Sequence, residues 1–378
     1  MKLHINLIKH IFLTLAFSCI FIGCNVQTDS SLPDDDKDNN SYKESDGEVA
    51  LIIGMGILSD SGYNQAAYEG IQTYALAAGI SYSHYAPVAD TPEAYKEAVL
   101  TALEDNAHLI ICAGPHFEQA VGDLQAVYSD RYFLLLDGVP RDSSGTPVPI
   151  APNVHCITYH EEEAGYLAGY MAVLEGYEKL GFIGGEQLAS VQRYGYGYLQ
   201  GINDAAAVLD KSGDISVDYW YADTFFPNQK TEDISLEWYQ NGTQVIFACG
   251  GSLYQSILPS ASACGGRLIG ADENQNGISD LFLTSAIKGV KSSVIVALDD
   301  FYAAGNTWPE EAAGKVISYG AAQKCIELPI SSETWRFKNA ALKDYLQILA
   351  ALKAGSIQIS AKTDVPPKTD ISVIYHNE

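Results

Sequence analysis

Residues 51–68, read LIIGMGILSDSGYNQAAY, constrain the fold of this chain more than any other stretch. An apolar run leads into a glycine-containing loop, and an alanine-rich pattern with helical spacing follows. That order is typical of a buried strand, a tight loop and a helix whose first backbone N–H groups face a ligand in α/β proteins. Tyr63 and Asn64 stand where this helix begins, which predicts a flat ring and an amide beside the ligand.

The remaining motifs argue against an enzyme. Gly54 and Gly56 match the start of a dinucleotide fingerprint, but the third glycine is missing at its position. Residues 160–163 lack the second histidine of HExxH, and the sequence contains no GxSxG elbow and no Walker A motif. We therefore expect no catalytic residues, no cofactor and no metal.

The folded body repeats one pattern of alternating strands and helices. Strand patterns at residues 80–85, 108–113, 132–136 and 154–158 alternate with helical ones, and a second series runs from residue 180 to residue 272. Short glycine-rich connections between such elements predict parallel sheets covered on both faces. We therefore predict an α/β fold of two similar lobes with a cleft between them.

Patterns after residue 281 indicate that the chain crosses back between the lobes, which makes a hinge and allows closure over a ligand. The predicted boundaries place residues 49–155 and about 272–312 in the first lobe. They place residues 156–271 and about 313–357 in the second, with residues 358–378 as a C-terminal tail. The helix at residues 161–175 carries small residues that favour close packing on a neighbouring helix, namely Ala164, Gly165, Ala168 and Gly169.

The first 24 residues resemble a bacterial lipoprotein signal. Lys2 and Lys9 precede a short apolar segment at residues 11–23, and Phe21-Ile22-Gly23-Cys24 is similar to a lipobox whose cysteine is lipidated. Plain secretion is the alternative. Residues 25–48 are rich in Asp, Glu, Ser and Asn, which predicts a solvated, disordered tether. A location outside the cytoplasm, anchored to the cell membrane through Cys24, follows from these two segments.

Charge and cysteine content exclude several kinds of partner. A net charge of −25 argues against nucleic acid and anionic membrane surfaces as partners. Five cysteines remain beyond the signal segment and show no CxxC pairing, so we expect buried free thiols rather than a zinc site.

Aromatic residues and carboxylates recur where strands are predicted to end. Flat rings can stack on a planar ligand, and carboxylates accept hydrogen bonds from its hydroxyl or N–H groups. Each of these residues can also be an ordinary loop residue. The set comprises Tyr63, Phe117, Asp137, Tyr194, Tyr196, Phe225, Phe226 and Asp272.

Residues 49–357 resemble the basic membrane protein family of substrate-binding lipoproteins, which includes purine-nucleoside receptors of ABC importers. Residues 62–66 (GYNQA) are similar to the Ser-Phe-Asn-Gln signature of that family, and residues 159–172 (YHEEEAGYLAGYMA) are similar to its acidic, then Tyr-Leu-Ala-Gly, helix. Later matches are Gly250-Gly251, Gly270-Ala271-Asp272, and residues 283–285 with Lys288. The resemblance implies two Rossmann-like lobes of the type I periplasmic-binding class.

The resemblance also implies roles for individual residues. A purine base is expected between Tyr63 and an aromatic residue of the second lobe, either Phe225 or Phe226. Asp137 is expected to contact the edge of the base. Asp272 and Lys288 are expected to bind the ribose hydroxyls, supported by the backbone of Gly251. Asn64 is a further polar contact. The family has Phe where this chain has Tyr63, so a different planar, hydroxylated ligand is an alternative.

The predicted function is capture of a purine nucleoside for an ABC permease by a monomeric, surface-anchored binding protein. A ligand sensor without a transport role is a second hypothesis. A secreted enzyme acting on nucleosides is a third, and the absence of a catalytic motif argues against it.

Overall fold

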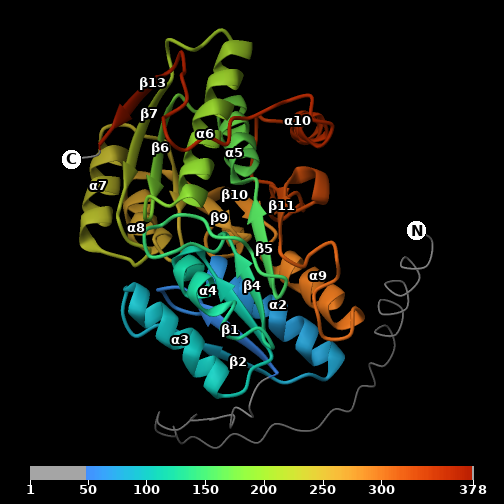
Figure 1. The fold of residues 1–378 in the computed structure, drawn as a ribbon. Coiled ribbons are helices and arrows are strands. Elements are labelled where there is room, and N and C mark those ends of the chain that lie inside the picture. Colours follow the sequence, from blue (N-terminus) through green and yellow to red (C-terminus); the bar gives the residue numbers. More distant parts are fainter. Residues whose placement is uncertain (1–47, 377–378) are drawn as a thin grey trace, which may run out of the picture. The chain divides into compact units, whose positions relative to one another are not determined.

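The computed structural model describes residues 48–376, which form two sheets, each covered on both faces by helices (Figure 1). The predicted signal segment, Cys24 and the predicted tether up to residue 47 lie outside the described residues. Within the described part of the chain, no helix is long and apolar enough to cross a membrane.

The first sheet has six strands in the order β11-β5-β4-β3-β1-β2, and all of them pair in parallel. Every residue of β1 and β3 is buried, as expected for strands covered on both faces. Helices α2 and α9 cover one face, and α3 and α4 cover the other. These elements form the first lobe: β1 (Val49–Ile53), α2 (Tyr63–Ala78), β2 (Tyr82–Tyr85), α3 (Pro92–Glu104), β3 (Leu109–Ala113), η1 (Pro115–Phe117), α4 (Glu118–Leu124), β4 (Tyr132–Leu136), β5 (Val154–Tyr159), α9 (Val290–Ala303) and β11 (Lys315–Tyr319).

The second sheet has seven strands in the order β12-β10-β9-β8-β6-β7-β13, with β12 antiparallel to β10 and the others parallel. Helices α5, α6 and α10 cover one face, and α7 and α8 cover the other. These elements form the second lobe: α5 (Glu161–Glu175), β6 (Lys179–Gly184), α6 (Ala189–Val208), β7 (Ser216–Tyr221), α7 (Gln229–Gln240), β8 (Val245–Cys249), α8 (Tyr254–Cys264), β9 (Arg267–Asp272), η2 (Gln275–Gly277), β10 (Phe282–Lys288), η3 (Ala321–Gln323), β12 (Ile326–Glu327), α10 (Leu342–Lys353) and β13 (Ser372–Tyr375).

The two lobes exchange helices. Helix α5 follows β5 of the first sheet but packs on α6 in the second lobe, whereas α9 follows β10 of the second sheet but packs on α2 in the first. The chain therefore crosses between the lobes three times, after Tyr159, after Lys288 and after Tyr319. These crossings agree with the predicted return of the chain between the lobes.

Strand pairing divides the chain differently from the predicted lobe boundaries. Residues 272–289 were expected in the first lobe, but β10 pairs with β9 in the second sheet. Residues 315–319 were expected in the second lobe, but β11 pairs with β5 in the first sheet. Residues 358–378 were expected to be a tail, yet β13 pairs in parallel with β7. The order of strands and helices along a sequence does not say which strands become neighbours, which is why these boundaries were misplaced.

Glycines bring α5 and α6 into backbone contact. A Cβ added at Gly165 would lie 2.0 Å from the Tyr194 carbonyl oxygen, and one at Gly197 would lie 2.1 Å from that of Glu162. Real Cβ atoms do not approach other atoms so closely, so these positions require glycine. The small residues of the helix at residues 161–175 therefore serve close packing, as predicted.

The cysteines of the described chain agree with the prediction of buried free thiols in all but one case. Cys112, Cys156, Cys249 and Cys325 are free and buried, whereas Cys264 is free and exposed.

Candidate ligand site between the lobes

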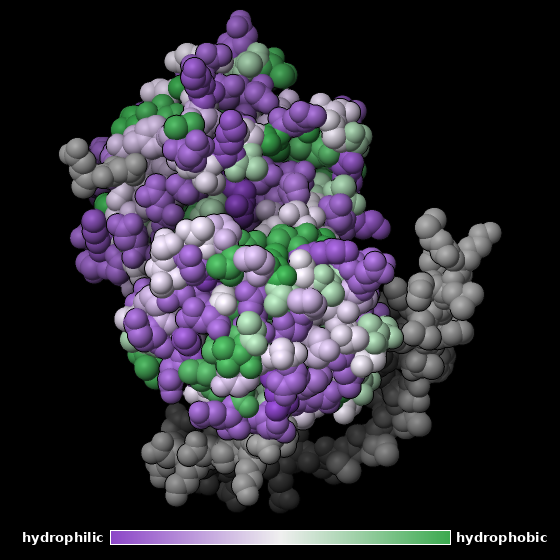
Figure 2. All heavy atoms as spheres, viewed as in Figure 1, coloured by the Kyte–Doolittle hydropathy of each residue, from purple (hydrophilic) through white to green (hydrophobic). Residues whose placement is uncertain are grey.

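A pocket lies between the two lobes, at the carboxyl ends of their strands. The space between the atoms that line it amounts to about 700 Å³, which includes open solvent. Loops after β1, β3 and β4 line it from the first lobe, and loops after β6, β7, β8 and β9 line it from the second. A hollow between the two lobes is visible on the face drawn in Figure 2. Parallel sheets bind their ligands at this edge.

The structure brings together seven of the eight residues that the family resemblance implied for the site, whereas the candidate rings of Phe117 and Tyr196 do not line the pocket. Phe225 lines the pocket, whereas its neighbour Phe226 does not and is 37% exposed. The predicted residues that line the pocket are Tyr63, Asn64, Asp137, Phe225, Gly251, Asp272 and Lys288.

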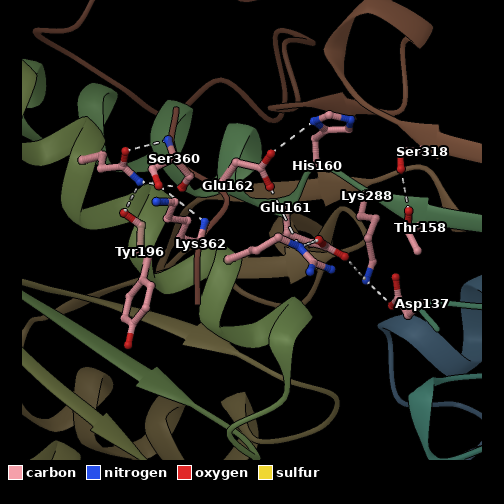
Figure 3. Close-up of polar contacts among 12 residues, drawn as sticks. Asp137, Thr158, His160, Glu161, Glu162, Tyr196, Lys288, Ser318, Ser360 and Lys362 are labelled. Carbon is pink, nitrogen blue, oxygen red and sulfur yellow. Dashed lines mark hydrogen bonds and ion pairs between the residues drawn. The ribbon is translucent and has the colours of Figure 1, made fainter. Parts of the chain in front are cut away.

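Lys288, the last residue of β10, lies at the centre of a buried ion cluster. Its Nζ is 2.7 Å from Asp137 Oδ2, 3.4 Å from Glu161 Oε1 and 3.5 Å from Asp272 Oδ1. Figure 3 shows the Lys288 side chain directed at Asp137. Burial alone lowers the pKa of Lys288, but the three carboxylates outweigh it and hold the pKa above its usual value. Lys288 is therefore a fixed positive charge that joins the two lobes.

Asp137 and Asp272 occupy matching places in the two sheets. Asp137 directly follows β4, and Asp272 ends β9, the strand at the corresponding place in the second sheet. Both backbones are left-handed, with φ of 61° and 65°, a conformation that Asp tolerates better than most residues. Burial raises the pKa of both carboxyls, to about 6 for Asp137. Among the described residues, Asp137 Oδ1 has no hydrogen-bond partner, so this buried oxygen lacks the partner that buried polar atoms normally have.

Tyr63 presents its ring to the pocket and hides its hydroxyl. Lys288 Nζ lies 4.6 Å from the ring centroid, within cation–π distance. Within residues 48–376 the buried Tyr63 hydroxyl has no partner at hydrogen-bond distance and angle. Burial, reinforced by the charge of nearby Asp137, raises the pKa of this hydroxyl well above its usual value. The Tyr63 side chain therefore offers the pocket a neutral ring.

Asp60, which was not among the predicted site residues, holds the loop that carries Tyr63. Its carboxylate accepts hydrogen bonds from the backbone N–H groups of Gly62, Asn64 and Gln65 at 2.8–3.2 Å. It thereby satisfies amides at the start of α2 that have no helical partner. Burial raises the pKa of Asp60 to about 6, although the three amides act in the opposite direction.

Replacing Asp60 with Asn should change the pH dependence of stability. Because the pKa of Asp60 is about 6 in the folded protein against an ordinary 3.8, the folded state binds more protons between these values, and this carboxyl's contribution to stability falls as pH rises. The free energy of unfolding of Asp60→Asn minus that of the wild type should therefore be larger by about 2–3 kcal/mol at pH 8 than at pH 4. Urea denaturation across this pH range measures the difference.

The exposed Asp142 provides the control for this experiment. The Ser144 hydroxyl and the Thr146 amide lower its pKa, so the difference between Asp142→Asn and the wild type should change with pH in the opposite direction. A difference for Asp60→Asn that stays constant with pH would contradict the expectation.

The Phe225 ring packs directly against the backbone of Gly185 and Gly250, where a side chain would collide with it. A Cβ added at Gly185 would lie 2.4 Å from the Phe225 ring, and one at Gly250 would lie 2.8 Å from it. Gly250 also has a φ of 143°, which side-chain-bearing residues rarely adopt. The glycine pairs after β6 and β8 therefore create the space in which this ring reaches the pocket.

Two further contacts connect the lobes around the pocket. His116 Nε2 lies 3.0 Å from Glu186 Oε2, and Gln275 Nε2 donates to the Ser61 carbonyl oxygen at 3.0 Å. Together with the Lys288–Asp137 pair, they hold the lobes against each other. The two lobes are therefore in direct contact beside the pocket.

Sequence reasoning missed two members of the ion cluster, Glu161 and Arg193. Glu161, the first residue of α5, was recognised only as part of the acidic start of a helix, but its carboxylate is fully buried and contacts Lys288. Arg193, in the first turns of α6, binds Glu161 Oε2 through Nε at 2.6 Å. Three consecutive acids at residues 161–163 gave no sign of which one faces inward.

Comparison with known proteins identifies the family of this chain. A family model described as ABC transporter substrate-binding protein PnrA-like matches residues 48–363. The chain belongs to this PnrA-like family. The match spans both lobes, which confirms the resemblance seen in the sequence motifs.

Curated proteins similar to this PnrA-like chain agree with the family. The ABC transporter nucleoside-binding protein BmpA of Lactococcus lactis subsp. cremoris is 23% identical over 360 residues, which cover 89% of this chain and 95% of that protein. Basic membrane protein B of Borreliella burgdorferi is 24% identical over 302 residues, covering 76% of this chain and 82% of that protein.

Solved structures support the fold of this PnrA-like protein. An ABC transporter solute-binding protein from Aeropyrum pernix K1 superposes with a TM-score of 0.71 at 17% identity, covering 84% of this chain and 94% of that one. A solute-binding protein of an ABC transporter from Conexibacter woesei has a TM-score of 0.64 at 19% identity, and the match covers 83% of this chain and 98% of that one. The fold is the type I periplasmic-binding fold, as predicted, and the protein is a substrate-binding protein of an ABC transporter.

Proposed function

We propose that this protein binds a purine nucleoside between its lobes and delivers it to an ABC permease. The observation that carries the proposal is the pairing, in one pocket, of an aromatic ring from each lobe with a buried carboxylate oxygen that has no partner among the described residues. A purine base has two flat faces and an edge with N–H donors, which such a pocket can meet. The Lactococcus relative is a nucleoside-binding protein, which supports the same ligand class.

The proposed contacts follow the arrangement of the pocket. The base stacks between Tyr63 and Phe225, and its edge donates to Asp137 Oδ1. The ribose hydroxyls lie near Asp272 and Lys288, with the Gly251 backbone and Asn64 as further contacts. Stacking on an aromatic ring contributes about 1–3 kcal/mol per base, so the two rings supply a large share of the affinity.

The charge of the pocket favours a ligand without phosphate. Three carboxylates surround Lys288, so this ammonium is already neutralised, and Asp60 adds another buried carboxylate to the pocket wall. A phosphate brought into this site would face uncompensated negative charge. We therefore propose that nucleosides bind and that the corresponding nucleotides are excluded.

Native mass spectrometry followed by a ligand panel tests the proposal. Protein purified without added ligand should retain a molecule with the mass of a nucleoside. After stripping, inosine, guanosine or adenosine should raise the unfolding temperature, whereas their 5′-monophosphates should not. Stripped protein that responds to none of the nucleosides would overturn the ligand assignment.

Alanine substitutions at the two neighbouring phenylalanines should separate their roles. Phe225→Ala removes a ring from the pocket wall, so we expect nucleoside binding to weaken by about 1–3 kcal/mol in isothermal titration. Phe226→Ala is the matched control, because this ring does not line the pocket. Equal loss of affinity in the two variants would show that Phe225 has no special role in stacking.

We further propose that the protein is anchored outside the cytoplasm through a lipid on Cys24. The signal-like segment and its lipobox-like ending support this. Labelling of growing cells with a fatty-acid analogue should modify the wild type and not Cys24→Ala, and this variant should be released into the soluble fraction. Equal labelling of both would contradict lipidation at this residue.

A further inference from the structure

Arg193 contacts the ion cluster at one point, the carboxylate of Glu161. It does not line the pocket, but its Nε binds Glu161 Oε2 at 2.6 Å while Lys288 Nζ contacts the other oxygen of the same carboxylate at 3.4 Å. Glu161 is fully buried, and Lys288 is 2% exposed. Figure 3 shows Glu161 beside Lys288, at the start of α5.

The cluster contains more carboxylates than cations. Within residues 48–376, Lys288 and Arg193 are the only cationic side chains at ion-pair distance from Asp137, Glu161 or Asp272. The three carboxylates thus compete for Lys288. A buried carboxylate without a counter-charge is costly, so Glu161 alone would attract Lys288 strongly. Arg193 supplies Glu161 with a counter-charge at its other carboxylate oxygen, Oε2.

The distances agree with a pairing of Arg193 with Glu161 and of Lys288 with Asp137. Lys288 is closer to Asp137, at 2.7 Å, than to Glu161, at 3.4 Å, and it stays above the Tyr63 ring. Glu161 is closer to Arg193, at 2.6 Å, than to Lys288, at 3.4 Å. Lys288 is therefore held at the pocket side of the cluster, where a ligand can reach it.

We propose that Arg193 and Glu161 are positioning residues, which hold Lys288 at the ligand and at the junction of the lobes without touching the ligand. Glu161 and Lys288 flank two of the three crossings between the lobes, so the same contact connects the pocket to the hinge. The nucleoside ligand is taken from the proposed function, whereas the placement of Lys288 by Glu161 and Arg193 does not depend on that function.

A charge-exchange series tests the proposal with inosine, guanosine and adenosine as probes. Arg193→Gln should weaken nucleoside binding about tenfold or more, because Lys288 is then drawn to Glu161. The double variant Glu161→Gln/Arg193→Gln should recover most of the affinity. Glu162→Gln/Arg193→Gln is the matched control and should not recover it, because Glu162 lies 3.9 Å from Arg193 and makes no ion pair with Lys288. Unchanged binding in Arg193→Gln, or equal recovery in both doubles, would overturn the proposal.

A crystal structure of Arg193→Gln without ligand provides a second test. Lys288 Nζ should move out of hydrogen-bond distance of Asp137 and closer to Glu161, and an unmoved Lys288 would overturn the inference. If the wild type binds none of the probes, the proposed function fails, but this structure still decides the positioning role. If Arg193→Gln does not fold, structures of Arg193→Lys and of the Glu161→Gln double variant decide it. Lys288 should keep its place in both.

Discussion

Lys288→Ala should lower the free energy of unfolding by about 3–5 kcal/mol at pH 7 and abolish ligand binding, because it leaves buried carboxylates without their counter-ion. The variant retains Asp137, Glu161 and Asp272, all nearly excluded from water. Urea denaturation followed by tryptophan fluorescence gives the stability, and isothermal titration gives the binding. The loss of stability should be smaller at pH 5 than at pH 8, since the orphaned carboxylates become neutral when protonated.

Lys291 offers a matched control three residues along the chain. It pairs with Glu69 at 2.8 Å, but its side chain is 40% exposed, and exposed ion pairs contribute only about 0–1 kcal/mol. Lys291→Ala should therefore change stability little and leave binding intact. Similar losses in the two variants would mean that the buried cluster has no special importance.

Gly197→Ala should destabilise the protein by about 3 kcal/mol, at the upper end of the cost of overpacking. The added methyl group would lie 2.1 Å from the Glu162 carbonyl oxygen and 2.6 Å from the Glu162 Cα, and backbone atoms cannot rotate away as a side chain can. Helix α6 would have to move from α5, which lengthens the Glu161–Arg193 contact. We therefore expect the nucleoside affinity to fall together with the stability.

Gly213→Ala is the control for this substitution. A Cβ at Gly213 would meet no atom within 4 Å, so its effect should remain within about 0.5 kcal/mol of zero, as for most surface changes. Denaturant titrations of both variants measure the comparison. If Gly197→Ala were as stable as Gly213→Ala, the close approach of α5 and α6 would not be needed for stability.

Alternating hydrophobic patterns were sufficient to predict the α/β architecture and the convergence of most site residues. Strand ends in a parallel sheet meet at one edge, so Tyr63, Asp137 and Asp272 could be grouped although they are distant in sequence. Glu161 and Arg193 could not be grouped with them, because helical residues point in directions that depend on how helices pack. The choice between Phe225 and Phe226 depended on the space above Gly185 and Gly250, which only the folded chain reveals.

The exchange of α5 and α9 also has a consequence for how the chain is made. The first lobe lacks α9 and its edge strand β11 until residue 319 has been synthesised, by which time β6 to β10 of the second lobe are already present. A nascent chain that ends after β5 would expose the apolar face that α9 covers in the complete protein. Neither lobe can therefore mature as an independent unit during translation, and we expect the two to become protease-resistant in a single late step.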